Sequence, residues 1–508
     1  MKRNLISNNQ RAITLVALVV TIIIILLLAG ITLTLFLKPG GLFSRAKESK
    51  DIHSKAEADS DIELAKIAAS ISEDAQLKKN KLIEELHKLG ITDSDIMDDG
   101  TSLKVKYKDY EYDISYNTIL IPVNIAFHDY INDEDLSETT QIKVSSDTQL
   151  DDTTVNMPEG YALYSNYNSS ITNPAVTIED EKATEDLYTL QVCKISSDNE
   201  ILIKNTTGLN NINIDLSNKY ALDNDIDLSS IAKWTPIGWT DSDDVSFTGT
   251  FNGNGKTLST LNCDYSSNSV TNVGLFALNS GTIKNLTITT TAVYGNTNIG
   301  IITGNNESTG RIENCHVSGP VRSLSNSGGG GAIAGSNSGT IFKCSAKSSV
   351  TGYFWTGGIA GKNYGTIEQT FFIGNVNGSL TDNQVSNKEA KYIGGIAGGT
   401  TGVIKDSYSI CTGSVKGYAG VGGIAGWYKN ATVTNTYCAG TDNVYGDLYV
   451  KVDLGYTPGG TSSTSGIYTF ATTTTGLTSI PSKFSSSIWK MNGQTYQSCP
   501  DLISNPRS

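Results

Sequence analysis

The chain has 508 residues, more than one ordinary domain holds, so we expect two to four folded units. Its formal net charge of −13 argues against general affinity for nucleic acid, and its 50 glycines predict a core of small and β-branched side chains. The seven cysteines form no CxxC pair and no Cys/His cluster. A zinc site is therefore not expected, and we expect no metal or other cofactor.

The first segment with a clear pattern is the uncharged run at residues 13–37, "ITLVALVVTIIIILLLAGITLTLFL". As a helix it would be about 37 Å long, enough to cross a hydrocarbon core of about 30 Å. Lys2, Arg3 and Arg11 precede it. Because positive charge stays on the cytoplasmic side, the sequence predicts a membrane protein whose remaining chain is extracellular.

The junction "QRAITLVALVVTIIIILLLAG" resembles the class III signal of type IV prepilins, in the variant common in Gram-positive bacteria. The resemblance implies a leader at 1–12, cleavage after Ala12 by a prepilin peptidase, and Ile13 as the N-methylated mature terminus. The helix at 13–37 would then be a membrane anchor and later a pilus spine that contacts other pilins. Ala12 stands where the family prefers Gly, and Ala17 where it usually has Glu. The alternative is a plain signal anchor.

A pilin-like helix and small sheet are expected over residues 38–126. A polar helical pattern runs from Leu42 to Leu89, where Gly90 ends it. The alternating stretch "SLKVKYKDYEYDISYN" that follows predicts a β-hairpin. Residues 127–186 are acidic, rich in Ser and Thr, and poorly periodic, so we interpret them as a linker or irregular insert.

Glycine-rich blocks then recur with a period of about 26 to 37 residues. They are "VGLFALNSGTIKNLTI" from 273, "IGIITGNNESTGRIENCHV" from 299, "GAIAGSNSGTIFKCSA" from 331, "GGIAGKNYGTIEQTFF" from 357, "GGIAGGTTGVIKDSYS" from 394 and "GGIAGWYKNATVTNTY" from 422. One aligned column holds Ile283, Ile312, Ile341, Ile367, Ile404 and Val433, and the column two residues earlier holds Gly281, Gly310, Gly339, Gly365, Gly402 and Ala431.

This pattern predicts a β-solenoid in which each repeat forms one coil. Short strands would pair with the coils above and below, about 4.8 Å away, so that the Ile/Val column forms an inward ladder. Glycine would supply positive φ at the corners and permit close approach of backbones. A single coil cannot bury its own apolar face, so stability would come from stacking.

The blocks resemble the GLUG-motif repeats of bacterial surface proteins over roughly residues 187–440. "LSNKYALDNDIDLSSIAKWTPIGW" and "FTGTFNGNGKTLSTL" are similar to the first coils of that family, and 441–508 would form a C-terminal cap. The resemblance implies a mainly β fold, a right-handed parallel β-helix (β-solenoid), preceded here by the transmembrane pilin-like N-terminal helix and a small α+β region.

Catalysis is not expected from the repeats, because general acid–base chemistry needs paired carboxylates on a rigid face. Asp406 and Glu313 are assigned to one column, which otherwise holds polar residues and is interpreted as an outward ladder; the others are Asn285, Lys343, Gln369 and Asn435. No Ser-His-Asp grouping is visible. We therefore expect a protein that is not an enzyme.

Two acidic stretches could suggest calcium. "DNDIDLSS" from Asp223 is interpreted as a turn followed by a strand, and "DSDIMDDG" from Asp93 lacks the Glu of an EF-hand loop at position twelve, which is Lys104. Cys315 and Cys344 share a column on neighbouring coils, within disulfide range. We expect them to be buried free thiols.

Aromatic residues in two blocks suggest a binding role: Tyr353, Phe354, Trp355, Trp427 and Tyr428. We expect them at corners or inter-coil loops, where they could stack on sugar rings; alternatively, they pack over coil ends or under loops. The sequence thus predicts a cell-surface, pilin-like adhesion protein, either a minor or tip pilin or an anchored adhesin. Its partner would be a glycan or surface protein of a host or of the environment. The alternative is a carbohydrate-active enzyme, a polysaccharide lyase or hydrolase on a parallel β-helix.

The leader generates the first prediction. After co-expression with its prepilin peptidase, the membrane form should begin at Ile13, with a methylated amino group, as read by mass spectrometry of the N-terminal peptide. Recovery of the chain with Met1 or Lys2 intact would leave only the signal-anchor interpretation.

Overall fold

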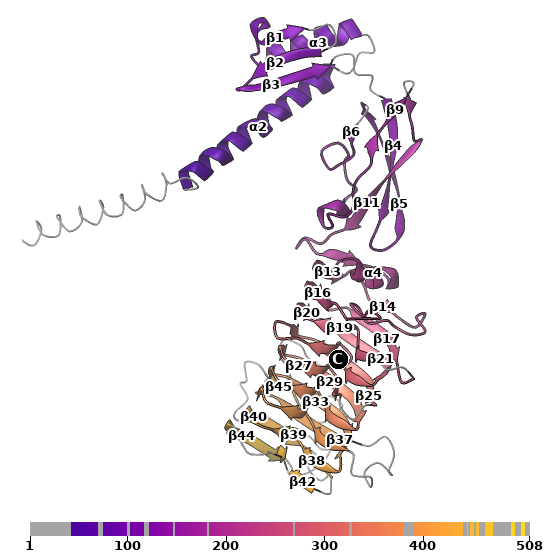
Figure 1. Cartoon of the computed structure of the whole chain (residues 1–508), viewed down its shortest axis with the longest axis vertical. Coiled ribbons are helices and arrows are strands. Elements are labelled where there is room, and N and C mark those ends of the chain that lie inside the picture. The colour runs from indigo at the N-terminus through magenta and orange to yellow at the C-terminus, as the bar shows by residue number, and fades with distance from the viewer. Residues whose placement is uncertain are drawn as a thin grey trace, which may run out of the picture. The chain divides into compact units, whose positions relative to one another are not determined.

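The computed structural model describes residues 42–69, 75–98, 102–115, 121–145, 148–179, 182–267, 270–324, 328–378, 390–439, 444–445, 448–451, 454–456, 463–470, 489–492 and 499–502. The chain divides into two compact units (Figure 1). The first comprises Met1–Val123 with Lys143–Thr148 and Val176–Thr184, and the second comprises Asn124–Ile142, Gln149–Ala175 and Glu185–Ser508. The leader at 1–12 and the predicted membrane helix at 13–37 lie outside the described residues.

The first unit is a small α+β structure. Its elements are α2 (Leu42–Ala69), α3 (Ala75–Lys88), the 3₁₀ turn η1 (Asp93–Asp95) and the strands β1 (Ile96–Asp98), β2 (Ser102–Tyr107) and β3 (Tyr110–Ser115). The strands form an antiparallel sheet in the order β1-β2-β3. Buried apolar residues of both helices and the sheet form one core: Ile62, Ala65, Ala69, Leu82, Leu86, Ile91, Leu103, Val105 and Ile114.

The end of α3 and the turn between β2 and β3 are formed by residues with positive φ. Gly90 has φ +85° and closes α3, with its N–H donating to the His87 carbonyl (3.0 Å) and the Ile91 N–H to Leu86 (3.2 Å). The predicted hairpin turns through Lys108 and Asp109, both at positive φ. No helix in the described part of the chain is long and apolar enough to cross a membrane.

The stretch at 127–186, expected to be a linker or irregular insert, instead contributes to a four-stranded sheet. The sheet has the order β5-β4-β11-β7, from β5 (Glu134–Val144), β4 (Ile121–Asp129), β11 (Leu187–Lys194) and β7 (Tyr161–Leu163). Two further short pairs are formed by β6 (Thr148–Gln149) with β8 (Ala175–Val176), and by β9 (Ile178–Glu179) with β10 (Lys182–Ala183), of which the β9–β10 pair belongs to the first unit. The physical reason is strict alternation along β4, which buries every second side chain.

This sheet continues directly into the first coil. The Asn132 side chain donates to the Leu202 carbonyl (3.0 Å) and accepts from the Lys204 N–H (2.8 Å). Ile131 and Tyr164, which forms part of the 3₁₀ turn η2 (Tyr164–Asn166), belong to the same hydrophobic core as the solenoid. The boundary predicted at 187 therefore falls inside the sheet, because β11 pairs with β4, and the solenoid begins at β12 (Ile201–Ile203).

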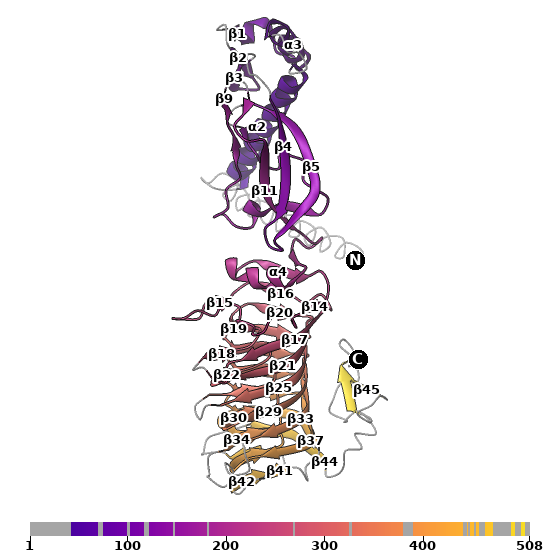
Figure 2. The same ribbon diagram turned by 90° about the vertical axis from the view of Figure 1, so that its right-hand side faces the viewer.

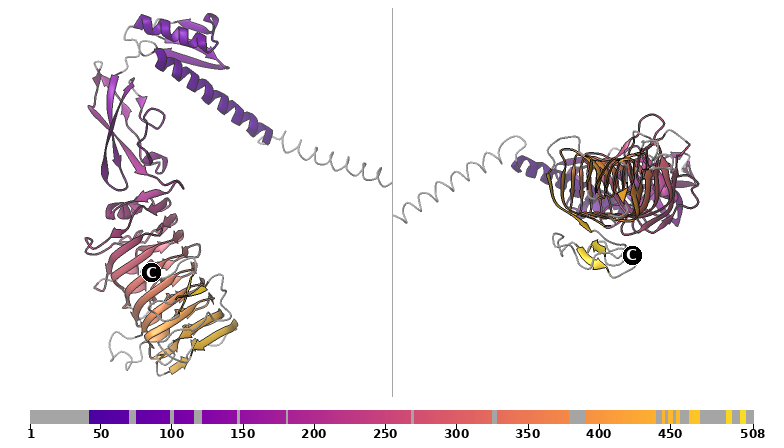
Figure 3. Two further views of the ribbon diagram at one scale, coloured as in Figure 1. Left: turned by 180° about the vertical axis from the view of Figure 1, so that it is seen from behind. Right: turned by 90° about the horizontal axis from the view of Figure 1, so that it is seen from below.

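The rest of the second unit is a parallel β-solenoid of about seven coils, which confirms the expectation of a mainly β, solenoid protein (Figure 2). Each full coil contributes two strands to an 18-stranded sheet and one strand each to a seven-stranded and an eight-stranded sheet. The strands of neighbouring coils pair in parallel throughout the described residues, as in β20 with β24 and β24 with β28. Seen along the stack, the coils overlie one another (Figure 3).

The short helix α4 (Thr206–Asn211) and the 3₁₀ turn η3 (Ile212–Ile214) lie between the first two strands of the 18-stranded sheet. The strands of this sheet are β12, β13 (Lys219–Leu222), β14 (Ile226–Asp227), β16 (Thr250–Asn252), β17 (Thr257–Asp264), β20 (Thr282–Lys284), β21 (Thr287–Gly295), β24 (Arg311–Glu313), β25 (His316–Ser323), β28 (Thr340–Phe342), β29 (Ser345–Gly352), β32 (Thr366–Glu368), β33 (Phe371–Asn377), β36 (Val403–Lys405), β37 (Tyr408–Lys416), β40 (Thr432–Ala439), β41 (Val444–Tyr445) and β44 (Ser463–Phe470). The eight-stranded sheet has β15 (Ser246–Phe247), β19 (Phe276–Asn279), β23 (Thr303–Asn306), β27 (Ala334–Asn337), β31 (Ala360–Asn363), β35 (Ala397–Thr400), β39 (Ala425–Tyr428) and β43 (Leu454–Tyr456). The seven-stranded sheet has β18 (Thr271–Val273), β22 (Thr297–Ile299), β26 (Gly330–Gly331), β30 (Phe354–Gly357), β34 (Lys391–Gly394), β38 (Ala419–Gly422) and β42 (Leu448–Lys451).

The Ile/Val column forms a continuous inward ladder. Its members pair in register from coil to coil and are fully buried: Ile283, Ile312, Ile341, Ile367, Ile404 and Val433. Phe251 precedes the ladder, paired with Ile283, and Thr464 follows it, paired with Val433. Identical branched side chains thus fill the narrow interior in layers.

The coil stack also extends past residue 440, where a cap was expected. β41, β42, β43 and β44 pair in parallel with the strands of the preceding coil. Parallel pairing needs only backbone groups, so a further coil forms without a glycine block. A separate antiparallel hairpin, β45 (Trp489–Asn492) with β46 (Cys499–Leu502), lies at the C-terminal end of the sequence.

The repeated glycines serve close approach and not positive φ. A Cβ at Gly365 would lie 2.0 Å from the Gly339 carbonyl oxygen, and one at Gly402 2.0 Å from that of Gly365. Positive φ falls instead on the residue two places after the Ile/Val ladder, which varies in type: Asn285, Asn314, Lys343, Gln369, Asp406 and Asn435. The expectation that glycine supplies the left-handed corners was therefore wrong at this corner, where Asn and other polar residues take positive φ, although Gly420 does so at another corner, with φ +64°.

The ladder generates the second prediction. Ile367→Asp would place an unpaired charge between coils, which costs several kcal/mol, and should lower the melting temperature sharply or unfold the stack. Thr366→Asp is the matched control, because Thr366 faces outward on the same strand. Equal circular dichroism melts for the two variants would contradict the inward assignment.

Candidate functional site

An aromatic cluster lies where the seven-stranded sheet meets the eight-stranded sheet. It comprises Phe354 and Trp355 of β30, Tyr392 of β34 and Trp427 of β39, all half-buried. The Trp355 ring centroid is 4.5 Å from that of Tyr392 and 5.3 Å from that of Trp427, the latter pair nearly perpendicular at 89°. Phe354 meets Tyr392 edge-on at 5.0 Å. Residues up to 73 positions apart thus share one aromatic surface.

The backbone at this corner is left-handed, which is unusual for bulky residues. Trp355 has φ 47° and Tyr392 has φ 62°. Two earlier coils carry Asn272 and Asn298 at the same position, where the Asn298 amide donates to Asn272 at 3.0 Å. Asn tolerates positive φ, whereas an aromatic residue there carries strain of about 1–3 kcal/mol. Such strain is concentrated at functional sites, so it favours a binding role for the cluster.

Gly399 makes room for the cluster. It pairs in register with Lys362 on one side and Trp427 on the other. A Cβ at Gly399 would lie 2.2 Å from Cζ3 of Trp355, so the indole ring lies directly over this glycine. Burial lowers the pKa of the neighbouring Lys362 amino group. At this corner the Trp355 ring therefore lies on the backbone of Gly399, and the rings of Tyr392 and Trp427 lie beside it.

The structure separates the five aromatic residues singled out from the sequence. Phe354, Trp355 and Trp427 join the cluster, whereas Tyr428 packs against the solenoid core. Tyr353 immediately precedes β30 and is half-buried. Trp355 lies at a left-handed corner of its coil, as expected. Trp427 and Tyr428 instead lie within β39, whose backbone pairs in the stack.

Two contributors were missed by sequence reasoning, Tyr392 and Gly399. Alignment of "WTGG" at 355 with "YIGG" at 392 would have placed Tyr392 in the Trp355 column, since Thr356 pairs with Ile393. No comparable signal existed for Gly399, because one glycine among many in the "GGIAGG" block gives no sign of the ring above it.

The polar column requires a correction. Glu313 does not share it: Glu313 pairs with Lys284 and Phe342, and the column member in that coil is Asn314. The column forms a chain of amide hydrogen bonds, with Asn314 donating to Asn285 at 2.8 Å and Asn435 to Asp406 at 3.0 Å. These side chains therefore bridge coils, as left-handed Asn and Asp corners do.

The acidic stretches are used in local bonding. Asp227 accepts hydrogen bonds from Thr260 Oγ1 (2.7 Å) and from the Ser229 N–H (3.1 Å), and the Thr260 hydroxyl holds the pKa of its carboxyl below the usual value. Asp223 pairs with Lys194 at 3.0 Å. In the loop from Asp93, Asp95 accepts from Thr92. Within the residues that the structure describes, no three His, Cys, Asp or Glu side chains gather as metal ligands would.

Cys315 and Cys344 are buried free thiols in the structure. Each thiol donates to backbone carbonyl groups, Cys315 to Glu313 (3.2 Å) and Cys344 to Phe342 (3.2 Å). Burial raises the pKa of the Cys315 thiol well above its ordinary value. A thiol kept protonated is a poor nucleophile, so this site points to packing and not to reactivity.

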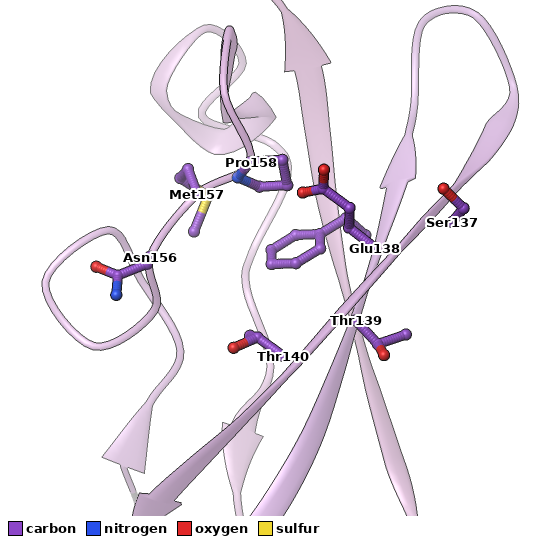
Figure 4. Close-up of a pocket in the computed structure, with 8 residues that line it drawn as sticks. Ser137, Glu138, Thr139, Thr140, Asn156, Met157 and Pro158 are labelled. Atoms are coloured by element: carbon purple, nitrogen blue, oxygen red, sulfur yellow. The ribbon is translucent and has the colours of Figure 1, made fainter.

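A pocket outside the solenoid lies against β5 (Figure 4). Figure 4 shows Glu138 and Thr140 on the side of β5 that faces Asn156, Met157 and Pro158, with Ser137 and Thr139 on the other side. The pocket measures about 520 Å³, but one carboxylate, one amide and three hydroxyls in an open hollow do not define a chemistry. The aromatic cluster remains the stronger candidate.

No family model matches the chain. A segment of 87 residues is 44% identical to halomucin of Haloquadratum walsbyi, which is 17% of this chain but only 1% of halomucin. Among solved structures, a candidate immunoglobulin A1 protease from Bacteroides ovatus aligns with a TM-score of 0.39 at 19% identity, over 54% of this chain and 86% of that one. An IgA1 protease aligns at 0.37 and 15%, over 75% of this chain and 29% of that one.

The position of Trp355 over Gly399 generates the third prediction. Gly399→Ala should displace the indole ring into solvent while the backbone stack holds, because only a side chain occupies the new methyl position. We expect a red shift of tryptophan emission with unchanged circular dichroism. Thr401→Ala, on an exposed neighbour, is the control. Identical emission spectra for Gly399→Ala and the parent would contradict this placement.

Proposed function

We propose that this chain is a cell-surface, pilin-like adhesion protein that binds glycans through the aromatic cluster of its solenoid. The cluster at Trp355, Tyr392 and Trp427 carries the proposal. Flat aromatic faces stack on the C–H faces of sugar rings, and Trp and Tyr bury large areas at little cost in side-chain entropy. The prepilin-like N-terminus would retain the protein at the membrane or in a pilus, as a minor or tip subunit.

The backbone strain supports a selected role for these rings. Other coils have Asn272, Asn298 and Gly420 at this corner, so the left-handed backbone does not itself require an aromatic side chain. Their side chains are half-buried and keep part of each ring accessible. A ligand that covers the rings would recover apolar surface from water, which offsets the strain.

Display on a surface would strengthen a weak site. Many copies on one cell turn individually weak contacts into an avid attachment, because later contacts form at high effective concentration. A narrow, rigid solenoid holds its corner residues in a fixed array along the stack. We therefore expect single sites of low affinity and strong binding only to polyvalent glycans.

The fourth prediction tests the cluster. The full chain in detergent, applied to an array of neutral and acidic oligosaccharides, should bind a subset of neutral sugars. The double variant Trp355→Ala, Trp427→Ala should weaken that binding by at least about tenfold, equivalent to about 1.4 kcal/mol. Tyr364→Ala is the matched control, because Tyr364 is an aromatic residue on the solenoid with 55% exposure and outside the cluster.

Two results would contradict the proposal: no binding by the parent chain, or equal binding by a folded double variant. The same oligosaccharides should be recovered intact after incubation. Cleavage products, seen as new reducing ends or unsaturated sugars, would favour the alternative of a carbohydrate-active enzyme instead.

A further inference from the structure

A second set of aromatic residues stacks on the wall of the 18-stranded sheet. Phe371, Tyr408, Tyr437 and Tyr468 pair in register on four successive coils, and we call them the wall column. The rings of Phe371 and Tyr408 are parallel, with centroids 5.1 Å apart and 2° between planes. This column is distinct from the corner cluster described above.

The register places the wall column on the outer face of the sheet. The next residues along the strands, Phe372 and Cys438, belong to the solenoid core. Successive side chains of a strand point to opposite faces, so Phe371 and Tyr437 point away from the interior. Earlier coils carry Thr287, His316 and Ser345 at this position. Thr287 and His316 are half-buried, and Ser345, next to Phe371, is 6% exposed.

The lower wall column is nevertheless buried. Phe371 is 1% exposed, Tyr408 2% and Tyr437 3%. The outward neighbour Phe342 on β28 remains half-buried, although it is flanked by coils on both sides in the same way. Stacking of rings along the column cannot account for the difference, because it leaves their outer edges in contact with water. Another segment of the chain must cover the wall column.

The C-terminal hairpin has the pattern that such a cover requires. Trp489 pairs with Leu502 and Met491 with Pro500, whereas the alternate pairs are Lys490 with Asp501 and Asn492 with Cys499. Residues directly opposite in an antiparallel pair share a face, so the hairpin has one apolar face and one mostly polar face. An isolated two-stranded hairpin is at best marginally stable in water, so it needs a surface to pack on.

The chain length permits the contact. β44 ends at Phe470 and β45 begins at Trp489, so residues 471–488 connect them. Fully extended, this segment could span roughly 60 Å, whereas the wall column from Tyr468 back to Phe371 crosses only three coil steps of about 4.8 Å. The hairpin can therefore reach the column of its own chain.

We propose that the apolar face of the β45–β46 hairpin docks on the wall column of the same chain. The occupant supplies one tryptophan, one methionine, one proline and one leucine to the wall column, and the removal of apolar surface from water on both sides favours the contact. The polar pair Lys490 and Asp501 then faces solvent. Docking closes the apolar wall to other molecules, so that the corner cluster remains the open aromatic surface.

The fifth prediction uses hydroxyl-radical footprinting of the full chain, with oxidation read by mass spectrometry at Phe371, Tyr408 and Tyr437. The parent should show slow oxidation at all three. Trp489→Ala with Met491→Ala should raise these rates severalfold, because the apolar face is lost. Lys490→Ala with Asn492→Ala, on the opposite face of the same strand, is the matched control and should leave the rates unchanged.

Phe372 gives an internal check on folding, because it points into the core beside Phe371 and should remain protected in every variant. Oxidation of Phe371, Tyr408 and Tyr437 that is fast in the parent, or equally slow in both double variants, would overturn the proposal. So would a parent that is dimeric by light scattering and becomes monomeric in the Trp489→Ala, Met491→Ala variant, since the hairpin would then cover a second copy.

Discussion

The spacing between coils is the constraint on which the structure depends. Parallel strands stack about 4.8 Å apart, and at the corners the chain turns so tightly that a carbonyl oxygen of one coil lies where the next coil would place a Cβ. At Gly339, Gly365 and Gly402 that distance is 2.0 to 2.1 Å. Only glycine fits there, whatever its φ. The regular spacing of these glycines along the sequence therefore marks the places where the backbones of neighbouring coils are in contact.

Because the coils stack in register, equivalent residues of successive coils lie above one another and form columns. Inside the solenoid, amides of Asn279, Asn306, Asn337 and Asn363 donate to one another along the stack at 2.8 Å, although all four are buried. From Asn279 to Asn363, each amide nitrogen has an oxygen of the next coil as its partner, the last being Thr400, which offsets the cost of burying these donors. In the Ile/Val ladder, side chains of successive coils bury one another's apolar surface in the same way. Adjacent coils stabilise one another through matched columns, and no single coil needs a core of its own.

Both proposals concern positions where the residue type of a column changes along the stack. At the left-handed corner, Asn in early coils gives way to Trp355 and Tyr392, and Gly399 leaves space for the indole ring. On the wall, Thr287, His316 and Ser345 are followed by Phe371, Tyr408 and Tyr437. Both changes fall in the C-terminal coils. They differ in exposure, because the corner rings remain half-buried while the wall rings are covered.

The sequence by itself determined the solenoid, the coil period and the inward Ile/Val column, because a stacked repeat imposes its spacing on every coil. It also indicated the β-hairpin of β2 and β3, because alternation of apolar and polar residues is a local signal. The tertiary structure alone decided which corner residues take positive φ, that residues 127–186 join a sheet, and that Tyr392 meets Trp355 while Tyr428 turns to the core. These outcomes depend on contacts between coils of unequal length. A shift of the strand pairing by one residue would also move every side chain of a strand from the inner to the outer face, or the reverse.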